Sequence, residues 1–549
     1  MEFKKNLPSF YTTGFNMAES GFPCLYTSKD KELGTLILNL RQTTMQDRRV
    51  IFIDGRQIMC SPNWVRDHCH QMKSFKHWEY DMKSFIDFIA AHQSEKGFFF
   101  EFLKMLDEPH LPLDIPEECR IDFPEDNYAL MRLELEADVE YLVVESAMYI
   151  YQVTGDDEWI KKLLPKLEKA IDYCTSDETR WAKEYGLVKR PLTIDTWDFP
   201  YHDGMARKID ENTPMSIMHG DNTGVYQAMK QLEWLNRRFG NEDKANNWAE
   251  RAETLKTNIY KYLWNGKFFM HQLHLNHSGE DDLENERLSL SNSYDMNRGI
   301  TEYEQNVSII NEYIERGKKT GAFAEWLTLD PPYERFPAWM NNYVKKGDYV
   351  NGGVAVFVAG ELAKAAFRNG MEEYAYGVLE RVYEIYKERG FLQFTYEPHD
   401  KGGQQSGPSG WGSAAVLSAI EEGLAGIIDT DVQYRKMRFE PCWPVTQYDE
   451  LRYITGYELG KVRIETGYRI CEEGVLYKLS SPSEEIKCHI YLPKGKKCSR
   501  VLLNGEETEY KNTTVGDSLY VDFNITSSGF KRDSDGYAVN KTYKIEIFY

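Results

Sequence analysis

Basic residues are in short supply in this sequence. The chain carries 66 Lys and Arg against 87 Asp and Glu, which gives a formal net charge of −21 over 549 residues. Because nucleic acids and anionic membrane surfaces are bound through basic patches, we expect no nucleic acid and no membrane as a partner. The same charge disfavours a polyanionic substrate and leaves neutral molecules as the best match.

Long apolar runs and paired cysteines are absent as well. No stretch approaches the ~18 apolar residues of a membrane span, and the opening MEFKKNLPSFYTTGF lacks the apolar centre of a secretory signal. The nine cysteines are odd in number, scattered, and without a Cys-x-x-Cys pair, which predicts neither a disulfide framework nor a zinc knuckle. These features predict a cytoplasmic protein.

Aromatic residues, by contrast, are abundant. They make up 14% of the chain, with 12 Trp and 36 Tyr, beside 42% hydrophobic and 28% charged residues. The overall balance is that of a globular protein with a sizeable core. The aromatic excess has two explanations, which are core filling and the stacking of flat rings on the apolar faces of sugars.

The spacing of apolar and polar residues changes twice along the chain. Residues 1–60 contain short β-like runs at 35–40 and 49–53, the second followed by the turn signal Asp54-Gly55, and predict a small N-terminal β extension. Residues 61–430 read as helical. Residues 431–549 alternate apolar and polar side chains in short runs, which predicts a C-terminal antiparallel β-sandwich acting as a packing appendage or a carbohydrate-binding module.

Helical periodicity is clearest at 134–153, which ends at Thr154-Gly155-Asp156-Asp157 with Gly as a C-cap and Asp as the next N-cap. Helices in pairs, joined by loops that alternate between short and long, favour a helical toroid over a bundle. The absence of a fixed-period repeat disfavours a solenoid. Further helices are predicted at 158–173, 226–238, 241–263, 301–318, 354–369, 372–389 and 413–424.

Four loops in the helical region set an acid beside an aromatic ring. They lie at 62–71, 192–199, 323–326 and 395–411. A surface ion pair or a helix N-cap explains any one of them. Their recurrence at the ends of successive helical hairpins favours a shared functional site.

Two of these loops resemble catalytic motifs. The stretch Asp195-Thr196-Trp197-Asp198-Phe199 is similar to the Gly-Trp-Asp-Phe type of segment that carries the general acid in trehalase-like enzymes, although the usual preceding Glu-Ser-Gly is replaced by Leu192-Thr193-Ile194. The loop 397–411, with Gly, Gln and Pro before a closing Gly-Trp, is similar to the one that carries their general base.

Two further segments match in the same order along the chain. Gly220-Asp221-Asn222-Thr223 resembles the Val-Asp-Leu-Asn helix start that follows the acid, and Trp64-Val65-Arg66-Asp67 resembles the Trp-x-Arg-Asp that opens the site. Over about residues 60–430 the chain thus resembles the six-hairpin glycosidases, which include trehalases, processing glucosidases and α-L-rhamnosidases. The resemblance implies a mainly α fold with an (α/α)6 toroid.

The resemblance also implies inverting glycosidase chemistry. One carboxylic acid protonates the leaving oxygen, and a carboxylate roughly 6.5–9.5 Å away activates water. We assign Asp198 as the general acid, with a pKa raised by burial near Trp197, and Glu397 as the general base. Asp195 is the rival acid, since the sequence does not settle which of the two points inward, and Glu325 is the rival base.

Several residues are expected to bind sugar. Arg66 and Asp67 would hold hydroxyl groups, with an ion pair in the barrel floor as the alternative. Flat rings would serve as sugar platforms or, alternatively, fill the core. The segment His68-Cys69-His70 does not predict a metal site, since alternate residues do not share a helix face. The full expected substrate-binding set is Trp64, Arg66, Asp67, Trp197, Glu325, Trp326, Trp339, Gln404 and Trp411.

The function predicted from these features is an inverting, exo-acting glycoside hydrolase for neutral oligosaccharides or small glycosides. Because the resembling enzymes bind sugar without a cofactor, we expect no cofactor here. Three alternatives remain open, which are a disaccharide phosphorylase of the same fold, a polysaccharide lyase and a non-catalytic sugar-binding protein. A retained base disfavours the first, and the negative net charge disfavours the second. Association into a homo-oligomer is also left open.

Overall fold

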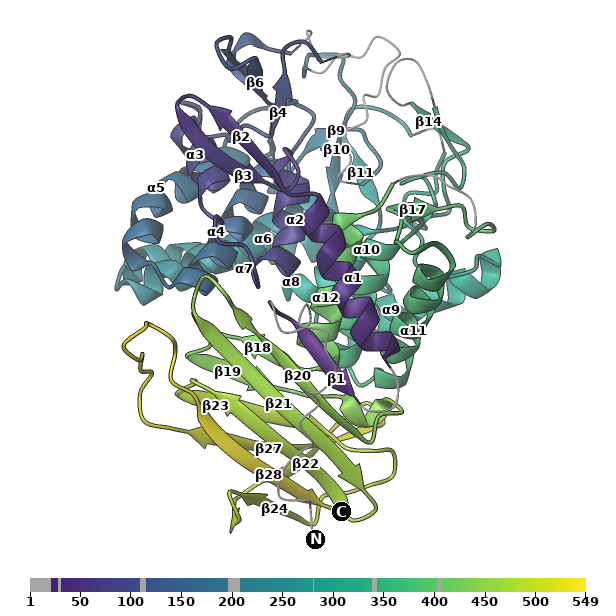
Figure 1. The fold of residues 1–549 in the computed structure, drawn as a ribbon. Helices are drawn as coiled ribbons and strands as arrows, with labels where there is room; N and C mark the ends of the chain where they lie inside the picture. The colour runs from purple at the N-terminus through teal and green to yellow at the C-terminus, as the bar shows by residue number, and fades with distance from the viewer. Residues whose placement is uncertain are drawn as a thin grey trace.

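The protein is represented by a computed structural model that describes residues 21–27, 31–108, 115–195, 208–279, 281–337, 343–401 and 407–549. The predicted site residues Trp197, Asp198, Trp339 and Gln404 lie outside these ranges. The helices occupy one part of the molecule, and two large sheets occupy the other (Figure 1).

Six helices, here called the ring helices, contact one another in a closed order. Each contacts the next along the chain, and the last contacts the first. Each begins after a loop at one common end, and the last continues as a π-helix over Ala419–Leu424. The ring helices are α2 (Val65–Phe75), α4 (Val139–Thr154), α6 (His219–Arg238), α8 (Ser291–Arg298), α10 (Val356–Arg368) and α12 (Gly410–Ser418).

The other six helices of the described ranges pack on the outside of the ring. They are amphipathic: α5, for example, buries Ile160, Leu164, Leu167 and Ile171 on one face and exposes charged residues on the other. The outer helices are α1 (Glu32–Gln46), α3 (Ser84–Ala91), α5 (Asp157–Cys174), α7 (Glu242–Leu263), α9 (Tyr303–Thr320) and α11 (Glu372–Arg389).

Ring helices α10 and α12 approach each other closely at a glycine. A Cβ atom added to Gly360 would lie 2.4 Å from the backbone carbon of Ala415. Contacts that short do not occur in proteins, so this crossing requires a residue without a side chain. In contrast, a Cβ at Gly377 of α11 would meet nothing within 4 Å.

The predicted helices from 134 to 424 are found, with α6 beginning earlier, at His219. Helices α2, α3 and α8 were not predicted. The strand predicted at 35–40 is wrong, because these residues lie in α1, where Leu33, Leu36, Ile37 and Leu40 are buried toward α2 and α12. A short run of β-branched and aliphatic residues suits either structure, and packing against the ring selects the helix.

The predicted strand at 49–53 is confirmed as β2 (Arg49–Ile53), which forms a hairpin with β3 (Arg56–Cys60). Asp54 and Gly55 both have positive φ, 51° and 65°, as a type I′ turn requires. Within the predicted β extension, residues 32–60 therefore form a helix and a hairpin.

The C-terminal part contains two sheets. The first is seven-stranded, in the order β1-β20-β21-β22-β28-β24-β25, and the second is five-stranded, in the order β18-β19-β23-β27-β26. Phe439 of β19 packs edge-on against Tyr477 of β22, with ring centroids 5.5 Å apart, so the sheets contact each other. Strands β19 and β23 pair in parallel, which makes the second sheet mixed rather than antiparallel as predicted.

The first strand of the described chain adds to the first sheet, where β1 pairs with β20. The strands of both sheets are β1 (Cys24–Thr27), β18 (Ile427–Asp429), β19 (Lys436–Phe439), β20 (Glu450–Tyr457), β21 (Val462–Cys471), β22 (Gly474–Ser481), β23 (Glu485–Tyr491), β24 (Arg500–Leu503), β25 (Glu506–Glu507), β26 (Lys511–Val515), β27 (Ser518–Thr526) and β28 (Lys541–Phe548).

Short strands gather in the loops that precede the ring helices, at the end of the ring away from the two large sheets (Figure 1). Some of them lead directly into a ring helix, as β10 leads into α6 and β16 into α10. These strands are β4 (Phe102–Met105), β5 (Arg120–Phe123), β6 (Tyr128–Met131), β7 (Trp181–Ala182), β8 (Leu187–Val188), β9 (Arg190–Pro191), β10 (Met215–Met218), β11 (Gln272–His274), β12 (Leu288–Ser289), β13 (Leu329–Asp330), β14 (Arg335–Pro337), β15 (Tyr343–Lys345), β16 (Val354–Ala355) and β17 (Thr395–Tyr396).

Two predictions from composition are tested by the same structure. The nine cysteines are unpaired, as expected from their scatter. Within the described ranges, no helix combines the length and the apolar character needed to cross a bilayer.

Candidate functional site

The loops at the N-terminal ends of the ring helices converge on buried charged side chains. Arg66 in the first turn of α2 reaches Asp138, which directly precedes α4, and His219 at the start of α6 reaches Asp295 in α8 at 2.7 Å. Helix N-termini carry a partial positive charge that favours acids nearby. The convergence places a polar site at this end of the ring.

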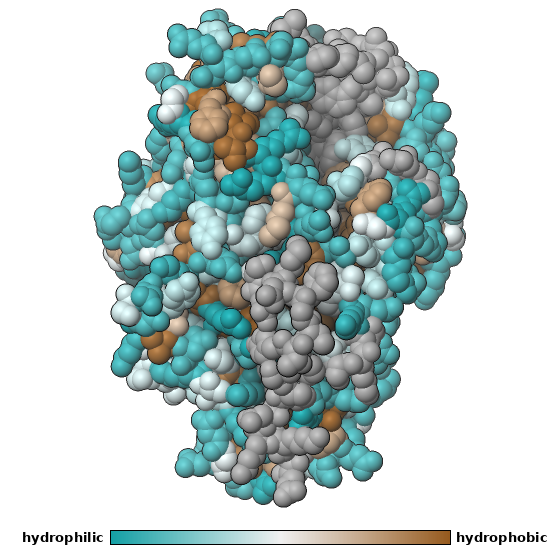
Figure 2. All heavy atoms as spheres, viewed as in Figure 1, coloured by the Kyte–Doolittle hydropathy of each residue, from teal (hydrophilic) through white to brown (hydrophobic). Residues whose placement is uncertain are grey.

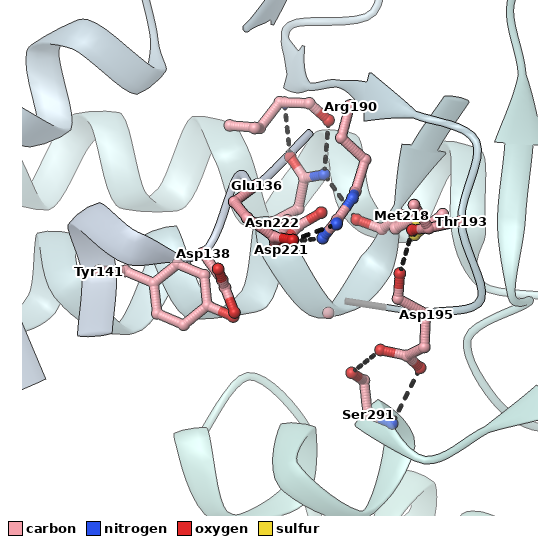
Figure 3. A network of polar contacts seen from close by, with 12 residues as sticks. Glu136, Asp138, Tyr141, Arg190, Thr193, Asp195, Met218, Asp221, Asn222 and Ser291 are labelled. Carbon is pink, nitrogen blue, oxygen red and sulfur yellow. Dashed lines mark hydrogen bonds and ion pairs between the residues drawn. The ribbon is translucent and has the colours of Figure 1, made fainter. Parts of the chain in front are cut away.

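The centre of this site is a network of two arginines and three acids, all at most 5% exposed. Figure 3 shows one of the arginines, Arg190, with the three acids Glu136, Asp138 and Asp221. Arg66 donates to Asp138 at 2.6 and 3.0 Å and also to Glu136. Arg190 lies 3.2 Å from Glu136 and 3.5 Å from Asp221. Arg66 is therefore part of a buried ion-pair network, which was the alternative to its predicted sugar contact.

None of the three acids in this network was singled out as a candidate acid from the sequence, and Asp221 has the most unusual environment of the three. Burial raises its pKa to about 6, with further upward contributions from Asp138 and Asp195 and an opposing one from Arg190. Its Oδ2 atom is buried and has no hydrogen-bond partner among the described residues. Asp221 is thus a carboxyl group that can be protonated near neutral pH. The only signal in the sequence was the motif Gly220-Asp221-Asn222-Thr223 at a helix start.

Asp195 is held in a different state. Its carboxylate accepts hydrogen bonds from both the backbone N–H of Ser291, at 3.1 Å, and the Ser291 hydroxyl (Figure 3). Burial by itself would raise the pKa of Asp195, but His219 and the hydroxyl groups of Ser289 and Ser291 hold it below the ordinary value. A general acid must carry a proton, so this environment disfavours Asp195 as the acid.

A buried histidine fixes the backbone at the same residue. The N–H of Asp195 donates to Nε2 of His271 at 2.8 Å, so Nδ1 of His271 carries the proton and donates to Glu284 at 2.7 Å. Glu284 is itself held by Arg287, at 2.9 Å, and by the Tyr333 hydroxyl. Asp195 has a φ of 50°, a left-handed conformation that is unfavourable for aspartate without such support.

The predicted sugar platforms differ in exposure. Trp64 is half-buried at the start of α2 and stacks on Phe102 with centroids 4.1 Å apart. Trp326 is fully buried, and Trp411 is 5% exposed and stacked on His70 at 4.1 Å. Because Trp326 and Trp411 have no free ring face, their burial supports a role in filling the core rather than in binding sugar. Asp67 is half-buried in α2.

Glu325, the rival base, is engaged elsewhere. Its carboxylate accepts two hydrogen bonds from Arg381, both at 2.6 Å, and one from Tyr374 at 2.7 Å. Both partners belong to the outer helix α11. These contacts hold the pKa of Glu325 below its ordinary value despite burial. The arrangement is that of a structural ion pair and disfavours Glu325 as a catalytic or sugar-binding residue.

Glu397, the predicted base, follows β17 and is exposed. It lines an open cavity of about 1430 Å³ together with Arg316, Asp330, Lys346 and His399. An exposed carboxylate beside an open cavity has access to water, which is what a general base requires.

The histidines of α2 are core residues. Burial lowers the pKa of His68 to about 3, and its Nδ1 accepts the backbone N–H of Ser61 at 3.1 Å. Across the described ranges, no three His, Cys, Asp or Glu side chains are grouped to hold a metal ion.

Comparison with known proteins finds similarity in structure only. No family model and no curated protein matches the sequence. An α-L-rhamnosidase from Dictyoglumus thermophilum is similar over 96% of this chain and 51% of its own, with a TM-score of 0.60 and 13% identity. The α-L-rhamnosidase of Streptomyces avermitilis, solved with L-rhamnose, is similar over 96% of this chain and 42% of its own, with a TM-score of 0.56 and 10% identity.

A rhamnosidase from Bacillus sp. GL1 gives a TM-score of 0.55 at 13% identity, over 83% of this chain and 41% of its own. The chain therefore spans about half the length of these structures or less. The similarity establishes that this protein shares the fold of these rhamnosidase structures, in agreement with the fold that the resemblance of the sequence motifs implied.

Proposed function

We propose that this protein is an inverting, exo-acting glycoside hydrolase for neutral oligosaccharides or small glycosides. The observation that carries the proposal is the convergence of buried acids and arginines at the N-terminal ends of the ring helices, in a fold shared with α-L-rhamnosidases. In this proposal the twelve α-helices of the described ranges form an (α/α)6 toroid, and the two C-terminal sheets form a β-sandwich.

We assign the general acid to Asp198 and the general base to Glu397. Support for Asp198 comes from its neighbour Asp195, whose lowered pKa and saturated carboxylate suit a positioning role. Support for Glu397 comes from its exposure beside an open cavity and from the structural ion pair that engages Glu325. The two carboxyl groups would act on opposite faces of the sugar, with water between.

Asp221 is proposed as a further polar residue of the same site. With a pKa of about 6, its carboxyl group can donate a hydrogen bond to a sugar oxygen when protonated and accept one when ionised. Trp64 and Asp67 at the start of α2 are proposed to contact the sugar, together with Trp197, Trp339 and Gln404.

The remaining expectations enter the proposal with one change, which concerns the N-terminal extension. The divisions at about residues 60 and 430, a cytoplasmic location and a small oligosaccharide as the partner are carried over from the sequence. The position of α1 against α2 and α12 adds that residues 32–46 pack as part of the helical region.

The decisive experiment is product release from a panel of α- and β-linked disaccharides and aryl glycosides, with and without inorganic phosphate. We expect free sugar of inverted anomeric configuration without phosphate, and its loss in Glu397→Gln. The matched control is Glu507→Gln, an exposed glutamate in β25, which should retain wild-type rates. Release that requires phosphate would instead assign a phosphorylase. Full activity in Glu397→Gln would overturn the base assignment.

A further inference from the structure

A second polar cavity lies at the opposite end of the ring, where the helices meet the C-terminal sheets. Its volume is about 390 Å³. It is bounded by one face of α4, one face of α6, the end of α10 and the segment from Ile427 to Tyr434. This cavity is separate from the candidate catalytic site, because its lining residues lie toward the C-terminal ends of α4 and α6 (Figure 1).

Amide side chains project into this cavity from two ring helices. Gln227 and Gln231 lie one turn apart on α6, and Gln152 lies on α4, where its Nε2 donates to the carbonyl of Asp429 at 3.0 Å. The Oε1 atom of Gln231 is buried and has no hydrogen-bond partner among the described residues. A buried acceptor without a partner is costly, so the site offers an unmet hydrogen bond to a donor.

The charges that line the cavity are of both signs. Lys76 and Lys364 lie at 3.2 and 2.6 Å from Glu422, and both lysines are at most 7% exposed. Glu145 and Asp429 add negative charge to the same wall, and burial raises the pKa of Asp429 to about 7. Because ammonium groups and carboxylates line the same wall, the cavity favours neither a simple anion nor a simple cation.

We propose that this cavity is a second binding site for a small neutral polyhydroxylated molecule of monosaccharide size. Its volume is in the roughly 300–1,000 Å³ range of small-molecule sites. Amides, ammonium groups and carboxylates together supply both the donors and the acceptors that hydroxyl groups need. The ligand enters where Lys230, 41% exposed, and Thr430, also exposed, line the opening.

The site also spans two parts of the chain. Next to the lining residues, Gln433 donates to the carbonyl of Thr154 at the end of α4, at 2.8 Å, and Arg238 at the end of α6 pairs with Asp431 of the lining. A ligand held between α6 and the segment 427–434 would contact the helices and the first strand of the second sheet together. The inference does not depend on the proposed hydrolase activity.

The test uses the full chain with D-glucose, D-mannose, L-rhamnose and sorbitol as separate probes. Crystals soaked with each probe show where it binds, and calorimetry gives the stoichiometry and affinity. We expect one of these probes in the cavity, hydrogen-bonded to Gln231. Replacing that amide in Gln231→Leu should weaken binding at this site about tenfold, as expected for one lost hydrogen bond. Gln57→Leu, at an exposed position in β3, is the matched control and should bind as the wild type does.

Three results would overturn the proposal. The first is a cavity that contains only water with every probe. The second is a probe bound only at the N-terminal end of the ring helices. The third is preferential binding of inorganic phosphate in the cavity, which would show that the chemical class is wrong. Absence of glycoside hydrolysis would have no bearing on any of these readouts.

Discussion

The substitution Asp195→Asn separates a positioning role from a catalytic one. The Asp195 carboxylate accepts two hydrogen bonds from Ser291, one from the backbone N–H and one from the hydroxyl. Hydrogen bonds to a buried charged group contribute about 1.5–3 kcal/mol each. Asparagine retains one oxygen and turns an NH2 group toward the other donor, so one bond is lost and one is weakened. We expect the free energy of unfolding to fall by about 3 kcal/mol at pH 7.

The pH dependence of this loss follows from the lowered pKa of Asp195. A carboxyl group with a pKa below its unfolded value stabilises the folded state above the unfolded pKa of about 3.9, and this stabilisation disappears as the pH falls through the folded pKa. The difference between the wild type and Asp195→Asn should therefore shrink when urea unfolding is repeated below about pH 4. Asp517→Asn, at an exposed turn, is the control and should change stability little.

Kinetics complete the test. Asp195→Asn should keep a bell-shaped pH–rate profile with a reduced kcat, because the proton donor remains. Asp198→Asn should lose the basic limb and retain hydrolysis only of substrates with an activated leaving group, which needs no protonation. The reasoning is refuted if Asp195→Asn unfolds like the wild type but loses the basic limb, since Asp195 would then be the acid.

Three more outcomes are expected. Burial raises the pKa of Glu421 to about 7, so the free energy of unfolding should fall by roughly 3 kcal/mol between about pH 4.5 and pH 8, as the buried carboxyl group loses its proton. Urea unfolding of Glu421→Gln should lack this decline. A decline as large as that of the wild type would contradict the prediction. His271→Leu should lower kcat more than KM and speed amide hydrogen exchange at Asp195, whereas unchanged exchange would argue against the histidine as its anchor. Gly360→Ala should lower the melting temperature by overpacking α10 against α12, while Gly377→Ala should leave it unchanged or raise it, and equal effects would disprove the close-contact argument.

The sequence by itself determined the helices and strands that bury one face and expose the other. Helices such as α5 and α7 have one apolar and one charged face, and strands such as β23 alternate buried and more exposed residues with a period of two. These patterns are visible without knowing the partners. Helix α8 shows the opposite case. Its sequence, Ser-Asn-Ser-Tyr-Asp-Met-Asn-Arg, reads as a polar loop, yet six of its residues are buried.

Only the tertiary structure makes α8 a buried helix, because partners distant in the chain satisfy its polar groups. Ser291 bonds Asp195, Asp295 bonds His219, and Asn292 bonds the backbone of Phe269. The candidate site also depends on partners that are distant in the chain. The motifs point to acids in the loops before the ring helices, but which acid is held ionised depends on side chains dozens of residues away. A pKa is set by burial and by neighbours in space, and a linear sequence contains neither.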